Sequence, residues 1–67
     1  MKLLVNGRSE EFPKEGATVL ELLQHKGILP QTVVVELNGT VLKRDCWGEA
    51  LLKEGDRVEI LRFVGGG

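Results

Sequence analysis

The chemistry that this chain could offer lies at its C-terminal end, in the stretch Gly65-Gly66-Gly67. Glycine has no β-carbon, so this stretch can extend, bend and pass through a narrow opening that other residues would block. The preceding residues, 57–64, are typical of a strand, which would hold the root of the tail and leave the terminal carboxylate within reach. The ordinary alternative is a frayed chain end, because disorder concentrates at termini.

Few side chains offer other chemistry. The single cysteine, Cys46, excludes a disulfide within the chain and any cysteine-based metal or iron–sulfur site built by one chain. Cys46 could relay a persulfide, but only Lys43 and Arg44 lie near it as cations, so a structural or neutral role is favoured. His25 has no visible partner for metal binding or catalysis and is expected beside the carbonyls of a helix end. Trp47 is expected to cover one end of the core with its indole nitrogen near water.

Length, composition and charge narrow the class of protein. The chain of 67 residues is one domain, too small to house a deep active site of its own, and its 42% hydrophobic and 28% charged residues are typical of a folded domain. The net charge of −1, without a basic stripe, argues against a nucleic-acid partner. The sequence lacks an apolar run of about 18 residues and its start is too quickly polar for a signal peptide, so we expect a cytoplasmic protein that does not bind membranes.

Turn and cap signals divide the chain into short elements. Asn6-Gly7 and Asn38-Gly39 are dipeptides that favour type I′ hairpin turns. Thr18 and Glu21 have the spacing of a capping box at the start of a helix, and Gly27 supplies a left-handed cap at its end, near residue 26. The buried face of this helix is expected to consist of Val19, Leu20, Leu22 and Leu23. The sequence predicts strands at 2–5, 8–12, 33–37, 40–42 and 57–64.

A short helical turn is expected between the fourth and fifth strands. Asp45 is predicted to cap it. The apolar residues that it is predicted to carry are Trp47, Ala50, Leu51 and Leu52.

The resulting order, β-β-α-β-β-short helix-β, predicts an α+β fold of the β-grasp (ubiquitin-like) type. It consists of a mixed sheet of about five strands, crossed by one helix, with one short helical turn. The first and last strands are expected to lie side by side and parallel in the middle of the sheet. We assign residues 1–64 to this domain and 65–67 to a flexible glycine tail.

Alternation along the strands predicts an exposed apolar patch. Because Glu59 must face water, Val58 and Ile60 are expected to face the helix. The same logic directs Leu3, Val5, Val33, Val35 and Leu37 inward and Glu36 outward. The four apolar residues that are expected on the open face, as one partner-binding patch, are Leu4, Val34, Leu61 and Phe63. Ordinary scatter of apolar surface is the alternative.

Several phrases of the sequence together resemble the thiamin-biosynthesis sulfur carrier (ThiS) family. They are the run from Leu51 through Ile60 into Phe63-Val64-Gly65-Gly66-Gly67, together with Val5-Asn6-Gly7, Gly16-Ala17-Thr18-Val19, Glu21-Leu22-Leu23, Val35-Glu36-Leu37-Asn38-Gly39, and Arg44 with Trp47. The resemblance spans the whole chain, and Cys46 is not part of the pattern.

The resemblance implies a carrier rather than an enzyme. An E1-like partner would use ATP and magnesium to adenylate the carboxylate of Gly67, because a free carboxylate is a poor electrophile and needs a leaving group. A sulfur donor such as a cysteine desulfurase would then supply the sulfur of a thiocarboxylate, which passes to thiazole synthase. Gly65 and Gly66 keep side chains away from the reacting carbon. The chain itself would bind no cofactor or metal, and we expect a monomer when it is free.

Three alternatives remain open from the sequence. One is a carrier of the same kind, the small subunit of molybdopterin synthase. The second is a ubiquitin-like modifier that is joined to lysines, and the third is a non-covalent binding module with an incidental glycine tail.

Overall fold

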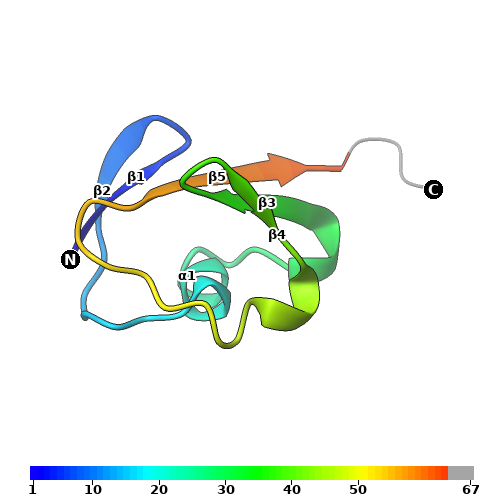
Figure 1. Ribbon diagram of the computed structural model, residues 1–67, viewed down its shortest axis with the longest axis horizontal. Helices are drawn as coiled ribbons and strands as arrows, with labels where there is room; N and C mark the ends of the chain where they lie inside the picture. Colours follow the sequence, from blue (N-terminus) through cyan, green and yellow to red (C-terminus); the bar gives the residue numbers. More distant parts are fainter. Residues whose placement is uncertain (64–67) are drawn as a thin grey trace.

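The computed structural model describes residues 1–63, and residues 64–67 lie outside the described part. Figure 1 shows the strands and the helix in the predicted order, to which the structure adds a 3₁₀ turn after the helix. The elements are β1 (Lys2–Val5), β2 (Arg8–Glu11), α1 (Val19–His25), a 3₁₀ turn at Pro30–Thr32, β3 (Val33–Leu37), β4 (Thr40–Leu42), a second 3₁₀ turn at Arg44–Cys46, and β5 (Arg57–Arg62).

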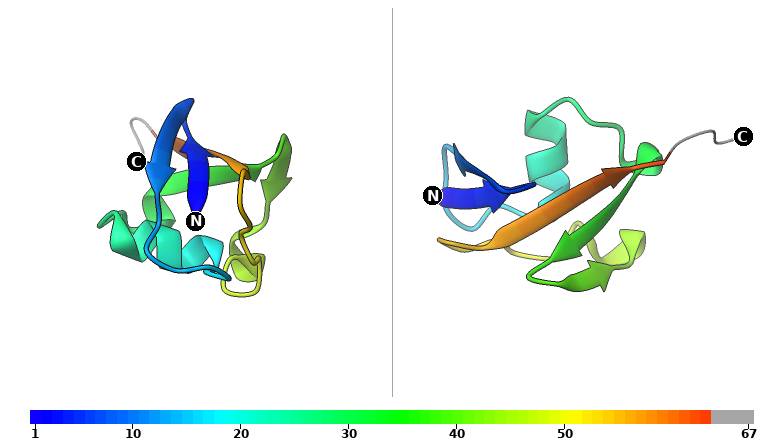
Figure 2. Two further views of the ribbon diagram at one scale, coloured as in Figure 1. Left: turned by 90° about the vertical axis from the view of Figure 1, so that its left-hand side faces the viewer. Right: turned by 90° about the horizontal axis from the view of Figure 1, so that it is seen from above.

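The strands form one mixed sheet within the described residues. Its order is β2-β1-β5-β3-β4, in which β1 and β5 are parallel and the other neighbours are antiparallel. α1 packs on one face, and the opposite face is left open (Figures 1 and 2). The β-grasp arrangement expected from the sequence, with the first and last strands adjacent in the middle, is confirmed.

α1 begins and ends where the sequence predicts. The Thr18 hydroxyl accepts a hydrogen bond from the Glu21 amide at 3.1 Å, and the Glu21 carboxylate accepts one from the Thr18 amide at 2.9 Å, so the capping box is complete. Gly27 follows the C-cap with φ +72°, a conformation in which a β-carbon would be strained. Leu20 is only half-buried, and the buried residues of the helix are Val19, Leu22 and Leu23.

Alternation assigns the sheet faces as predicted. Val58 and Ile60 are buried against the helix side with 0% and 8% exposure. Leu61 and Phe63, in contrast, are 47% and 52% exposed. Leu37, which was expected to be buried, is half-buried.

The second 3₁₀ turn differs from the expectation. It begins at Arg44, so Asp45 lies inside it, and no side chain caps its start. Trp47 is buried, but its indole nitrogen donates to the Leu42 carbonyl at 3.1 Å instead of lying near water. Leu51 is 65% exposed and lies beyond the turn. The turn can be as short as three residues because the hydrogen bond from the Trp47 indole to the Leu42 carbonyl holds this segment against the end of β4. A capped helix is not needed for that.

Both asparagines of the hairpin turns also bind the central strand. The turns are of type I′, since Asn6 and Asn38 have φ +50° and the glycines that follow have φ +82° and +88°. The Asn6 side chain accepts from the Ile60 amide at 2.6 Å and donates to the Ile60 carbonyl at 3.0 Å. It thereby continues the hydrogen-bond ladder along β5 after the backbone of β1 has turned away.

Asn38 plays the corresponding part at the start of β5. Its side chain accepts from the Arg57 amide at 2.9 Å and donates to the Asp56 carboxylate at 3.1 Å. Burial raises the pKa of Asp56, but hydrogen bonds from the Lys53 amide and from Asn38, with the Lys53 ammonium 3.4 Å away, outweigh it, so this pKa lies below its ordinary value.

Replacing Asn6 should destabilise the fold through the Ile60 bonds. Asn6→Gly keeps the positive φ without strain, so the loss of about 1–2 kcal/mol in the free energy of unfolding comes mainly from the two lost hydrogen bonds. Asn6→Asp keeps the acceptor and should lose less. Urea denaturation of the three proteins measures this order, and a glycine variant as stable as the parent contradicts it.

Asp56 should make stability depend on acid pH. Its folded-state pKa is depressed, so its contribution is fully present above its unfolded-state pKa and is lost as pH falls through the folded-state pKa. The difference in unfolding free energy between the parent and Asp56→Asn should therefore shrink between about pH 6 and about pH 2. Chemical denaturation across this range measures it, and a constant difference would overturn the assignment.

Candidate functional site

Arg62 and Phe63, at the C-terminal end of β5, are the root of the glycine tail, and hydrogen bonds to the neighbouring segment hold them in place. In the β3–β5 ladder, Val33 lies opposite Arg62, the last residue of β5. The Phe63 amide then donates to the Thr32 carbonyl at 2.9 Å. The backbone is thus hydrogen-bonded to its neighbour as far as the last described residue. Val64, predicted to end the strand, and Gly65, Gly66 and Gly67 lie outside the described residues.

Apolar side chains lie on the open face beside this root. Val34 is directly opposite Leu61, so these two side chains are neighbours on one face. Val34 is half-buried, whereas Leu61 is 47% exposed. Phe63 follows two residues beyond Leu61 and is also exposed. We call Val34, Leu61 and Phe63 the root patch.

Leu4, the fourth residue of the predicted patch, is exposed but lies apart from the other three. It is opposite Arg57 in the β1–β5 pair, four residues before Leu61. At about 3.3 Å per residue, this places it roughly 13 Å from Leu61 along the sheet. The strand register, which alternation alone cannot supply, therefore separates Leu4 from the root patch.

Two carboxylates occupy the space between, and sequence reasoning did not include them in the site. Glu36 and Glu59 lie directly opposite each other across β3 and β5, and Val41 on β4 is opposite Glu36. Like charges opposite each other cost stability. None of the ion pairs found within residues 1–63 involves either carboxylate. The sequence already predicted that both glutamates face outward. It could not predict that they lie opposite each other, because that depends on the register between β3 and β5.

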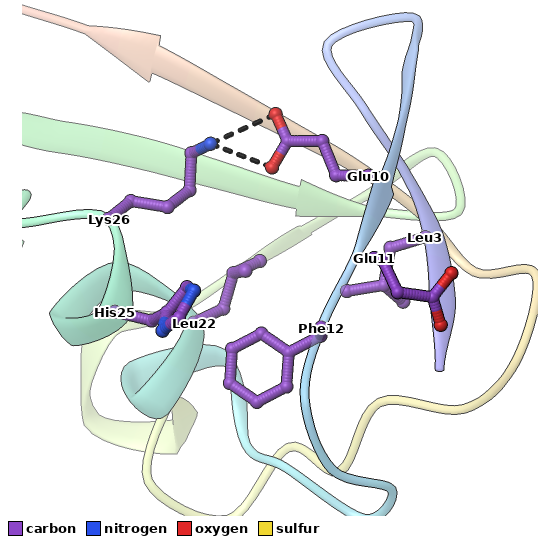
Figure 3. A pocket seen from close by; sticks show the side chains of 7 residues that line it. All are labelled: Leu3, Glu10, Glu11, Phe12, Leu22, His25 and Lys26. Atoms are coloured by element: carbon purple, nitrogen blue, oxygen red, sulfur yellow. Dashed lines mark hydrogen bonds and ion pairs between the residues drawn. The ribbon is translucent and has the colours of Figure 1, made fainter.

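The other side chains singled out from the sequence have structural surroundings. His25 is the last residue of α1, and its ring packs edge-on against Phe12 with the ring centroids 5.0 Å apart (Figure 3). The exposed Cys46 thiol lies 3.7 Å from the Asp45 carboxylate, to which it donates. The Arg44 guanidinium lies 5.7 Å from the centre of the Trp47 ring.

Residues 1–63 bring together no group of three or more His, Cys, Asp or Glu side chains that could hold a metal ion. Among the described elements, no helix is both long enough and apolar enough to cross a membrane.

The fold defines a ubiquitin-like β-grasp protein whose central strand, β5, precedes the three glycines in the sequence. The model of the ThiS family matches residues 3–67. The sulfur carrier protein ThiS of Bacillus subtilis is 32% identical over 65 residues, which cover 97% of this chain and 98% of that protein. The chain belongs to the ThiS family, as the sequence phrases indicated.

The chain is also similar to a solved structure of the same fold and to a part of a longer protein. The crystal structure of the thiamine biosynthesis protein ThiS from Geobacter metallireducens superposes with a TM-score of 0.88 at 42% identity and full coverage of both chains. A thiazole synthase of Magnetococcus marinus is 41% identical over 68 residues, which cover this whole chain but 20% of that protein. The chain thus spans about a fifth of the length of this relative.

The root patch should bind a partner without being needed for folding. Phe63→Asp places a charge on an exposed side chain, so the melting curve should be unchanged, while affinity for the adenylating enzyme that the family resemblance implies should fall by about tenfold or more. Leu51→Asp, at another exposed leucine away from the root patch, is the matched control. Calorimetric titration measures both, and equal affinities would remove Phe63 from the site.

Proposed function

We propose that this protein carries sulfur for thiamin biosynthesis as a thiocarboxylate on Gly67. Membership of the ThiS family supports the carrier role, as does similarity along nearly the whole length of the Bacillus subtilis sulfur carrier protein. The structural observation that favours it most is the anchored end of β5 beside the root patch, because a covalent carrier needs a reactive end that starts from a defined docking surface.

The proposed chemistry takes place at a backbone atom. The Gly67 carboxylate attacks the α-phosphorus of ATP, pyrophosphate leaves, and the carboxyl carbon is joined to AMP. A persulfide then attacks that carbon and AMP departs, which joins the carrier to the donor through an S–S bond. A second thiol cleaves this bond and forms a disulfide with the donor sulfur, which leaves sulfur in place of one oxygen on the carboxyl carbon. Gly65 and Gly66 provide a backbone without β-carbons that can approach closely inside a narrow partner site.

The acid–base groups, nucleotide and magnesium of this reaction belong to an E1-like partner, and this chain acts as a covalent substrate rather than as an enzyme. A cysteine desulfurase is the proposed source of the sulfur. The protein would work in the cytoplasm, where ATP is present and a lone thiol such as Cys46 stays reduced.

Thiazole synthase is the proposed acceptor of the sulfur. Two relatives named thiazole synthase contain a stretch similar to this whole chain, as a fifth of their length. Such a union of two domains in one chain raises their effective concentration, which is of use when one domain must pass a group to the other.

Intact mass spectrometry tests the carrier role. After incubation with ATP, magnesium, an adenylating enzyme and a sulfur source, the mass should rise by the difference between one sulfur and one oxygen, and fragmentation should map the change to Gly67. Deleting Gly67 should abolish the change, since the reacting carbon would then belong to a differently placed residue.

The controls separate this reaction from its alternatives. Cys46→Ser should load as the parent does, because the thiol lies outside the proposed path, and lost loading would make it a sulfur relay. A mass that never changes with an enzyme active on another ThiS protein overturns the proposal. Gly67 found in isopeptide linkage to lysine would indicate a modifier instead.

A further inference from the structure

A hollow of about 380 Å³ lies on the helix side of the sheet, near the end of β5. Its floor is apolar and consists of Val5, Ile28, Val33 and Ile60. The hollow exists because α1, with seven residues, is only about 10 Å long and ends at His25, before it has crossed the whole inner face. Its size and apolar floor are within the range of sites that bind small groups.

Two arginines stand on opposite sides of this floor. Arg8 on β2 is opposite Val5, and Arg62 on β5 is opposite Val33. Val5 and Val33 are buried towards the helix, and directly opposed residues share a face of the sheet. Both arginine side chains therefore lie on the helix side, where they line the hollow.

The charges around the hollow are not balanced. The Lys26 ammonium already binds both oxygens of Glu10, at 2.8 and 2.9 Å, as the dashed lines in Figure 3 show. The side chain of Asn6 is engaged with Ile60. Within residues 1–63, Arg8 and Arg62 take part in none of the ion pairs, so the hollow keeps two unmatched positive charges.

The neighbouring hollow lacks this surplus. It has a volume of about 310 Å³, lies between β2 and α1, and shares the Glu10–Lys26 pair (Figure 3). Its remaining polar side chains are Glu11 and His25, so it offers no unmatched arginine. Of these two hollows, the one beside the end of β5 carries the surplus positive charge.

We propose that the hollow bounded by Arg8 and Arg62, here called the arginine hollow, binds an acidic side chain of the partner protein that receives the tail. The acidic residue would be carried next to an apolar one, which contacts Ile28, the half-buried residue of the floor. A guanidinium group forms paired hydrogen bonds with a carboxylate, so two of them around an apolar floor match that combination.

A protein partner is favoured by position. Arg62 immediately precedes Phe63, so any protein that takes the tail from the end of β5 passes beside the arginine hollow. The root patch lies on the other face of the same strand. The inference rests on the proposed carrier function and adds to it a second, charged contact surface on the helix side.

Matched substitutions test the proposal against both partners. Arg8→Gln and Arg62→Gln each remove one charge and keep most of the stem, and Lys43→Gln removes one charge from an exposed residue away from the hollow. Affinity for the adenylating enzyme or for thiazole synthase should fall by about three- to fivefold for each arginine variant, as for a strong exposed charge pair, and should be unchanged for Lys43→Gln. Added salt should reduce the difference.

A measurement without any partner keeps this test separate from the carrier function. Acetyl-Leu-Glu-Leu-amide should shift the backbone amide signals of Val5, Val33 and Ile60 in nitrogen-15 NMR spectra, and acetyl-Leu-Gln-Leu-amide should not. Parent-like affinity of both arginine variants for both partners overturns the proposal. Equal shifts with the glutamine peptide, or with inorganic phosphate instead, would also overturn it. None of these outcomes decides whether Gly67 forms a thiocarboxylate, because mass spectrometry of the parent protein measures that separately.

Discussion

The structure depends above all on the insertion of β5 between β1 and β3. The last strand of the chain takes the central place of the sheet, parallel to the first strand and antiparallel to the third. Its inner side chains, Val58 and Ile60, are buried in the core. β5 is held from both sides as far as Ile60, by β1 with the Asn6 side chain and by β3, and the residues that lead to the tail are held from the β3 side. A central C-terminal strand thus gives a small domain a fixed point from which a chain end can project, which an edge strand would hold less firmly.

The side chains of two turns complete this insertion. Asn6 and Asn38 adopt the positive φ that a type I′ turn requires, and each also bonds to β5, at Ile60 and at Arg57 respectively. These bonds are made where the neighbouring strands turn away and the backbone of β5 would otherwise lose its partners. Asp56 extends the second contact by accepting from Asn38 and from the Lys53 amide. The hairpins and the central strand are therefore stabilised by the same few polar groups, so local turn chemistry supports the long-range pairing.

The two faces of the sheet near the end of β5 differ in charge as well as in shape. The open face carries the root patch, with the opposed carboxylates of Glu36 and Glu59 next to it. The helix face carries the arginine hollow, which exists because α1 is short. In the proposed carrier the reactive atom would belong to the backbone, so no catalytic side chain would select its partners. In such a protein, recognition falls to the surfaces on either side of the tail, and opposite charges on the two faces allow different partners to be distinguished.

The sequence by itself determined the local elements and the family. Capping residues, Asn-Gly turns and alternating apolar residues act through neighbours a few positions apart, so α1, both hairpins and the facing of Val58, Ile60 and Leu61 could be predicted. Only the tertiary structure decided which residues of neighbouring strands lie opposite each other. Register brings Val34 beside Leu61, leaves Leu4 beside Arg57, opposes Glu36 to Glu59 and places Arg8 and Arg62 around one hollow. These relations join residues far apart in the chain, and alternation, which repeats every two residues, specifies a face but not a partner.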